Sequence, residues 1–190
     1  GGGSGFIISK DGYVLTSNGA GVDPTFQVPL SGFTLATPVA STSGTAITFT
    51  GIPAGTKIIN VTFDSVSTDS NNPIIIQLGD AGGIENTLYL STASAWQSAP
   101  EIAFTTATDG FVIRNASVGS GLVLHGTLQL HLENASTFTW VASGALSLSS
   151  TYMGIAAGRK SLSAELTQVR VTTQTGTNTF DAGSINISYI

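Results

Sequence analysis

The sequence of 190 residues contains no cysteine and little charge. The absence of cysteine excludes disulfide bonds, thiolate metal sites and cysteine nucleophiles. Only 9% of the residues are charged, with 6 Lys and Arg against 11 Asp and Glu, whereas globular proteins average about 25%. Because phosphate binding requires clustered cations and the sequence has no basic cluster, we expect no nucleic-acid partner.

Long apolar runs are also missing. No run approaches the ~20 residues that cross a membrane, and no charged segment followed by an apolar one opens the chain, so we expect no membrane insertion. Hydrophobic residues nevertheless make up 41% of the sequence, which is too many for a disordered tail. A folded chain with so few surface charges is expected to bury part of its surface against copies of itself.

Small residues dominate the composition, with 23 Ser, 26 Thr and 23 Gly. Thr favours pleated strands and Gly supplies the backbone angles of turns. Apolar and polar residues alternate in segments such as 46–50, 59–63 and 184–190, and in residues 121–133 the leucines share one face. Turn signals recur about every ten residues, and no segment shows a helical period with caps. The sequence therefore predicts an all-β fold, an antiparallel β-sandwich of the jelly-roll kind.

The N-terminal segment reads as a separate part. Residues 1–5 are interpreted as a flexible lead-in or an expression remnant. Asp11-Gly12, between two short apolar segments, predicts a hairpin with a type I′ turn. We therefore divide the chain into residues 1–5, a stem hairpin and connector over 6–30, and a sandwich domain over 31–190. Further strands are expected at 73–78, 86–91, 101–105, 110–115 and 138–142, with a bend near 167–168.

Catalytic signatures are missing. His125 and His131 lie in one predicted strand without a Gly-x-Ser-x-Gly elbow. They would lie ~20 Å apart, too far to share one metal ion within a chain. Six carboxylates could meet in space as a glycosidase pair, although we favour their interpretation as solvated turn acids; they are Asp64, Asp69, Asp80, Glu85, Asp109 and Asp181. We expect no enzyme, no metal and no other cofactor.

Several residues of the sequence suit the binding of a sugar. Trp96 lies among small residues, where no alternation buries it, so its ring is expected at the surface. An exposed indole beside hydroxyl and amide groups suits a sugar, because the ring covers the apolar face of a pyranose. Burial in the core or in a subunit contact remains the alternative. The candidate glycan-binding residues are Trp96, Tyr152 in a predicted loop, and the turn residues Asp69, Asn71 and Asn72.

Three parts of the sequence resemble bacteriophage tail-fibre proteins. Asp11 to Phe26 (DGYVLTSNGAGVDPTF) resembles a unit that recurs in fibre stems. Residues 43–53 with 77–85, and the closing segments 166–173 and 176–187, are similar to phage and prophage structural proteins. The resemblance implies a homotrimeric fibre end located in the virion. It also implies a stem that contacts other tail-fibre or virion proteins and a head that binds a host-surface glycan or other receptor.

Two alternatives stay open. The first is a purely structural virion protein, such as a head fibre, a decoration protein or a baseplate attachment, without receptor binding. The second, less favoured, is an enzyme that trims surface polysaccharide, which would need a carboxylate pair in a groove. The resemblance itself implies no individual binding residues.

Overall fold

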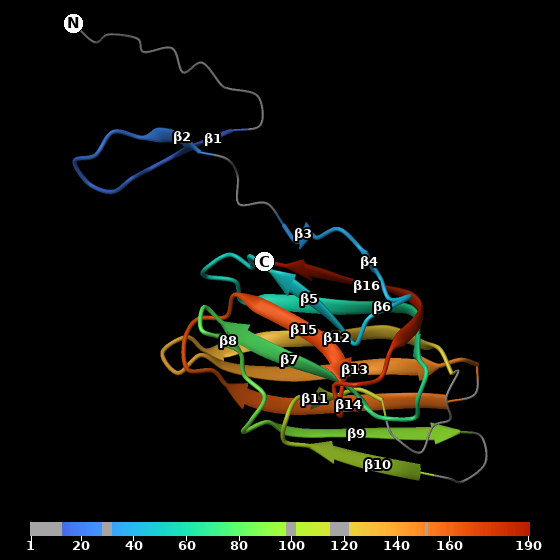
Figure 1. Ribbon diagram of the computed structural model, residues 1–190. Helices are drawn as coiled ribbons and strands as arrows, with labels where there is room; N and C mark the ends of the chain where they lie inside the picture. The colour runs from blue at the N-terminus through green and yellow to red at the C-terminus, as the bar shows by residue number, and fades with distance from the viewer. Residues whose placement is uncertain (1–12, 28–31, 98–101, 115–121, 151) are drawn as a thin grey trace, which may run out of the picture. The chain divides into compact units, whose positions relative to one another are not determined.

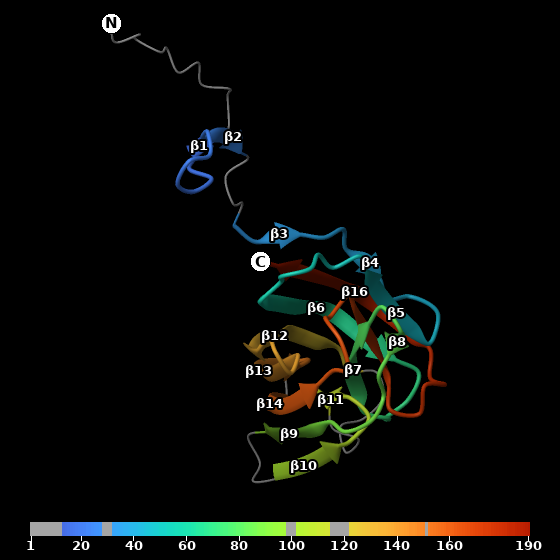
Figure 2. The same cartoon turned by 90° about the vertical axis from the view of Figure 1, so that its left-hand side faces the viewer.

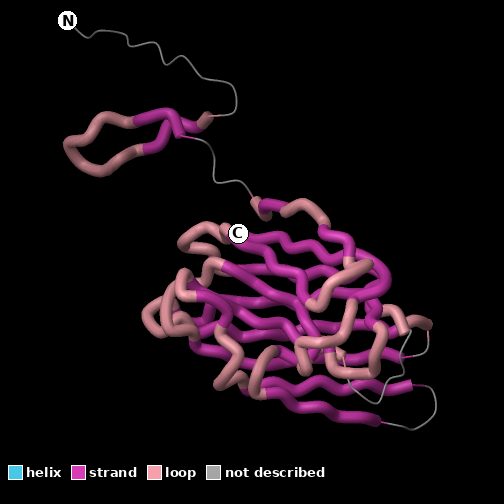
Figure 3. Tube along the Cα trace, viewed as in Figure 1, coloured by secondary structure: helices cyan, strands magenta, loops and turns pink. Residues whose placement is uncertain are grey.

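The computed structural model describes residues 13–27, 32–97, 102–114, 122–150 and 152–190 (Figure 1). By its internal contacts the chain divides into two units, residues 1–34 and 35–190. The described residues form strands joined by turns and loops, without a helix (Figure 3). The all-β prediction is confirmed. The division falls between Thr34 and Leu35, a few residues after the boundary that we expected from the sequence.

The first unit contains one described hairpin. Strand β1 (Val14–Thr16) pairs antiparallel with β2 (Thr25–Gln27), and Leu15 lies opposite Phe26. The loop between them is held by the Asn18 side-chain amide, which donates to the Asp23 carbonyl oxygen at 2.7 Å. The predicted Asp11-Gly12 turn and the segment before it lie outside the described residues.

The second unit contains two antiparallel sheets (Figure 2). The strands of the large sheet run in the order β10-β9-β14-β13-β12-β6-β16, and β4 also pairs with β16. Their bounds are β4 (Val39–Ala40), β6 (Ile58–Thr68), β9 (Leu90–Gln97), β10 (Ile102–Ala107), β12 (Leu124–Asn134), β13 (Thr139–Leu148), β14 (Tyr152–Ser161) and β16 (Phe180–Tyr189). The short strand β3 (Thr34–Leu35) precedes them.

The small sheet has the order β11-β7-β15-β5, with β8 paired to β7. Its strands are β5 (Ala46–Thr50), β7 (Ile74–Asp80), β8 (Gly83–Ile84), β11 (Phe111–Val112) and β15 (Gln168–Thr173). Strand β7 is buried along its whole length. This confirms the expectation that the apolar run at 73–78 forms a deeply buried strand.

The hydrophobic core lies between the inner faces of the two sheets. In β12 the leucines Leu124, Leu128 and Leu130 are buried, whereas Gln129 on the opposite face is exposed. From the small sheet, Val169 and Val171 belong to the same core and are fully buried. The sheets do not close into a barrel, so the predicted β-sandwich is confirmed.

Several predicted bounds were wrong. Strand β13 continues from the expected end at Ala142 to Leu148, and β9 begins only at Leu90. The segment 162–167 is not a strand; Leu162 and Leu166 are buried and anchor a loop that enters β15 at Gln168. The bend expected near 167–168 therefore marks the start of a strand.

Candidate functional site

A hollow of about 440 Å³ at one end of the large sheet brings two predicted site residues together. Its lining consists of Trp96, Gln97, Ser147, Ser149, Ser150, Tyr152 and Met153. Strand β9 ends here, β14 begins here, and the loop after β13 closes the side. We call this hollow the aromatic hollow.

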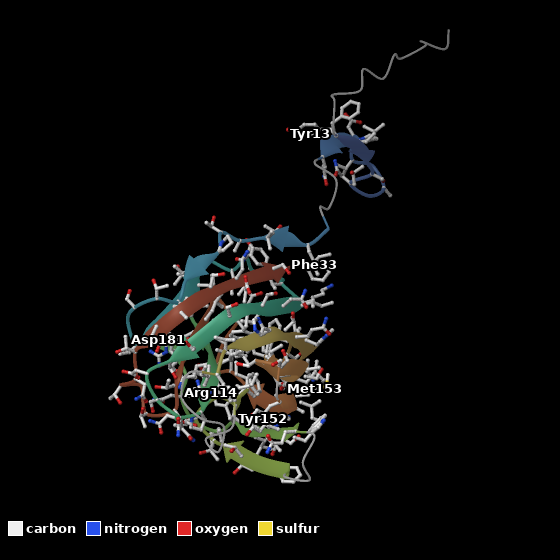
Figure 4. The ribbon with its side chains drawn as sticks, turned by 90° about the vertical axis from the view of Figure 1, so that its right-hand side faces the viewer. Tyr13, Phe33, Arg114, Tyr152, Met153 and Asp181 are labelled. Carbon is white, nitrogen blue, oxygen red and sulfur yellow. The ribbon has the colours of Figure 1, made fainter. Side chains whose placement is uncertain are left out.

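Strand register decides which side chains face the hollow. Met153 lies opposite Trp96 on one side and opposite Ser147 on the other, so these three side chains share the outer face of the sheet, away from the core. Tyr152 lies opposite Gln97 and Leu148, and its ring packs against the core. Figure 4 shows Tyr152 and Met153 at the start of β14. The hollow therefore wraps around the end of the sheet.

Two expectations about the aromatic residues need correction. Tyr152 was predicted in a loop, but it is the first residue of β14 and is half-buried. Trp96 is half-buried in β9 rather than freely exposed. In both strands the alternation is carried by small residues: in β9, Ala93 and Ala95 point inward while Thr92 points outward. Hydropathy contrast between such residues is too small to reveal a strand.

A serine-rich loop forms the hydroxyl side of the hollow. Ser149 adopts a left-handed conformation with φ 52°. It is held by two hydrogen bonds to Val123: the Ser149 N–H donates to the Val123 carbonyl at 2.7 Å, and the Val123 N–H donates to Ser149 Oγ at 3.2 Å. Among the described residues, the side chains of Gln97, Ser147 and Ser150 line the hollow without a hydrogen bond to the rest of the chain.

The three predicted turn residues lie elsewhere. Asp69, Asn71 and Asn72 follow β6, and none of them lines the aromatic hollow. The Asp69 carboxylate accepts from the Thr179 N–H at 3.1 Å, and the Asn72 amide donates to Asn178 Oδ1 at 2.7 Å. These two side chains therefore tie the turn to the loop that precedes β16, whereas Asn71 is exposed.

The guanidinium of Arg114 is buried beneath this turn and helps to hold it in place. Arg114, labelled in Figure 4, is fully buried. It donates to Thr68 Oγ1 at 3.1 Å and to the Ser70 carbonyl at 2.6 Å. Burial lowers the pKa of Arg114, because the charged guanidinium loses its hydration. Its contacts order the same turn that carries Asp69.

Two of the six candidate carboxylates meet at Ser163. Asp80 Oδ2 accepts from the Ser163 hydroxyl and Glu85 Oε1 from the Ser163 N–H, both at 2.7 Å. The Ser163 hydroxyl lowers the pKa of Asp80. Burial opposes ionisation of Glu85, but hydrogen bonds from Lys160 and Ser163 outweigh it and lower the pKa of its carboxyl. Neither residue is the acid of raised pKa that glycoside hydrolysis uses.

The other four carboxylates are dispersed among separate partners. Asp64 accepts from Ser65, Asp69 from Thr179, Asp109 from Gln174 and Asp181 from Ser67. His125 Nδ1 accepts from the Ser65 N–H at 3.2 Å. The expectation of solvated turn acids is therefore wrong for three of the six, because Asp64, Asp80 and Asp181 lie in β6, β7 and β16 and Asp80 is buried. The separate partners of the acids do not form a glycosidase pair.

Wider searches supply no ligand or relative. Within the described ranges, no group of three or more His, Cys, Asp or Glu residues is placed to hold a metal ion. No helix in that part of the chain is long and apolar enough to cross a membrane. Comparisons with protein-family models, with curated proteins and with solved structures find no match.

Proposed function

We propose that this chain is the head of a bacteriophage tail fibre and that the aromatic hollow binds a carbohydrate of the host surface. One observation carries the proposal: the fold places Trp96 and Tyr152, 56 positions apart, around a single hollow with an amide and three serine hydroxyls. The Trp96 ring lies on the outer face and Tyr152 packs against the core at the edge of the hollow; an aromatic face with polar groups beside it suits a sugar. The sequence resemblance supports the assignment to a fibre.

The chemistry of the hollow suits a neutral sugar. The Trp96 ring, on the outer face beside Met153, offers a flat apolar surface for the C–H face of a pyranose. Gln97 can donate and accept, and the hydroxyls of Ser147 and Ser150 can do both as well, which matches the dual character of sugar hydroxyls. The described residues that line the hollow are uncharged, which suits a neutral sugar.

Weak single sites fit the proposed biological role. In a homotrimer, three hollows engage one cell surface, and the second and third binding events occur at a high effective concentration. The protein would act in the virion, where the N-terminal stem contacts other tail-fibre or virion proteins. No cofactor is needed for such adsorption.

Replacement of Trp96 tests the proposal. We expect Trp96→Ala to weaken binding to a panel of bacterial lipopolysaccharides and capsular polysaccharides by about tenfold or more, which corresponds to roughly 1.4 kcal/mol or more per site. Trp96→Phe should retain part of the binding, because it keeps an aromatic surface. The melting temperature should change little, since the ring is only half-buried.

Asn71→Ala is the matched control, because Asn71 is exposed on the turn outside the hollow. Loss of binding in Asn71→Ala with none in Trp96→Ala would move the receptor site to the turn after β6. Unchanged binding in Trp96→Ala, or its collapse in stability, would overturn the assignment of the hollow. Binding to no glycan on host cells would favour a purely structural virion protein.

A further inference from the structure

The outer face of the large sheet carries large apolar side chains that are exposed in the part of the chain that the structure describes. Phe104 is 70% exposed, Leu90 66%, Ile155 54% and Met153 51%. All four point outward from three neighbouring strands, β10, β9 and β14. We call this surface, together with the small residues between them, the outer patch.

The outer patch ends within the sheet. Farther along the same face, Thr127 and Gln129 of β12 and Thr62 and Asn60 of β6 are polar. The three apolar strands span ~14 Å and the rows from Met153 to Arg159 span ~20 Å, so the patch measures roughly 300 Å² in projection. The largest apolar patch of a typical monomer covers about 300–600 Å² and is often functional, and the outer patch has this size.

The outer patch has a raised part and a recessed part, which could fit each other in a contact between two molecules. Phe104 and Ile155 flank Ser94, which lies opposite both and is only 8% exposed, so the two large side chains form a ridge. A trough lies beside this ridge, two residues further along each strand. It is formed by Thr106, Thr92 and Ala157. A hollow of about 450 Å³ lies over this trough and is bounded by Leu90 and Arg159. Anchors of this size seat in such hollows at protein interfaces.

We propose that the outer patch is the contact between copies of this chain, with Phe104 of one copy seated over the trough of a neighbour. A second copy is the occupant that the surface fits, because anchor and hollow both occur on this chain, so the anchor of each copy can seat in the hollow of the next around a closed ring. Among its described side chains the patch has no acid, and Arg159 at its end is the one cation, so like charges there do not oppose the contact.

The area supports a contact of moderate size. Stable interfaces bury about 800 Å² on each partner, and accessible surface exceeds projected area on a face with ridges and troughs. The outer patch with its Ser and Thr rim therefore approaches the standard size. The proposal rests on the proposed function only for the number of copies, which is three in a fibre head. The aromatic hollow begins at Met153, so it lies at the rim of the contact.

Solution mass tests this proposal on the full chain. By size-exclusion chromatography with light scattering, the wild-type protein should have three times the chain mass of 19.3 kDa. Phe104→Asp and Ile155→Asp should each lower the mass threefold while circular dichroism still reports folded β-structure. Gln129→Asp is the matched control, because Gln129 is exposed on the polar half of the same face, and it should leave the mass unchanged.

Cross-linking gives a second readout that does not depend on charged variants. Since the chain has no cysteine, Thr106→Cys introduces a unique thiol at the trough. A short bismaleimide should join copies through Thr106→Cys and not through Gln129→Cys. A monomeric wild type would overturn the proposal and leave an unrelated apolar partner or a lipid surface as the occupant. An oligomer that both aspartate variants leave intact would overturn it too.

Failure of the proposed function gives a different result. If only the carbohydrate assignment is wrong, the wild type is an oligomer that the patch variants dissociate, and it binds no glycan. If only the contact is wrong, Trp96→Ala still lowers glycan binding while the patch variants keep the wild-type mass.

Discussion

Replacement of Lys160 by Met tests whether a buried ion pair stabilises the sandwich at the end of β14. Lys160 Nζ lies 2.5 Å from Glu85 Oε2, and the Lys160 side chain is 1% exposed. The ammonium also donates to the Thr87 carbonyl at 3.0 Å and lies 5.2 Å from the centre of the Tyr89 ring. Met preserves most of the apolar stem but removes the charge, so the Glu85 carboxylate loses its counter-ion.

The expected cost follows from this geometry. Breaking a buried pair by removing one partner costs about 3–5 kcal/mol, because the other charge stays buried. The Glu85 side chain is 22% exposed, so water can partly solvate the carboxylate. We therefore expect a loss of stability at the lower end of this range, about 3 kcal/mol. At roughly 2–4 °C per kcal/mol for a chain of this size, the melting temperature should fall by about 6–12 °C.

Three controls make the result interpretable. Lys57→Met removes an exposed charge and should change the stability by no more than about 0.5 kcal/mol. The double variant with Glu85→Gln should recover part of the loss, because no charge is then buried. In Lys160→Met, burial without a counter-ion raises the pKa of Glu85, so the deficit should shrink as the pH is lowered from 7 to 4.

All melting curves should use one protein concentration, because self-association makes the melting temperature depend on concentration. A Lys160→Met protein that melts together with Lys57→Met would refute the reasoning. It would mean that the Glu85 carboxylate is solvated well enough to need no counter-ion.

Two further predictions concern pH and backbone geometry. The pKa values of Asp80 and Glu85 lie below their ordinary values of 3.8 and 4.5, so their stabilisation is complete above about pH 5 and is lost as the pH falls toward the lowered values. The urea midpoint should therefore hold from pH 7 to 5 and then drop; a midpoint unchanged at pH 3 would contradict this. Gly183→Ala should destabilise far more than Gly55→Ala in urea titrations. Both glycines have positive φ, 87° and 82°, which costs about 1–2 kcal/mol for Ala, but only at Gly183 would the added Cβ lie 2.4 Å from the Asp64 carbonyl oxygen. Equal losses would contradict the clash.

Strands with large alternating residues could be predicted from the sequence. Ile47 and Phe49 in β5, and the leucines of β12, alternate with polar residues and point into the core as expected. Parts of β9, β13 and β14 could not be predicted, since Ala, Ser, Thr and Gly occupy both faces. In these strands the size of a side chain, more than its polarity, decides which residue fits. At Gly144, for example, an added Cβ would lie 2.4 Å from the Thr127 carbonyl oxygen.

The candidate site could be predicted only in part. Trp96 was accessible to sequence reasoning, because no neighbouring alternation explained a large aromatic residue among small ones. Its partnership with Ser147 and Ser150 depends on the register of β9, β14 and β13, which no local signal specifies. The same holds for Phe104 and Ile155: each is unremarkable in sequence, and only the strand order places them on one face.

The position of β6 between β12 and β16 in the large sheet has a kinetic consequence. Val61 pairs with Leu128 on one side and Ile187 on the other, 67 and 126 positions further along the chain. The entropy of closing such long loops is lost before the contacts form, so folding of this topology belongs to the slow class, on the order of milliseconds to seconds. During that interval a chain with only 9% charged residues has little electrostatic repulsion to keep unfinished copies apart. Dilution should therefore raise the refolding yield, and the cell must limit encounters between newly made chains until β16 has paired with β6.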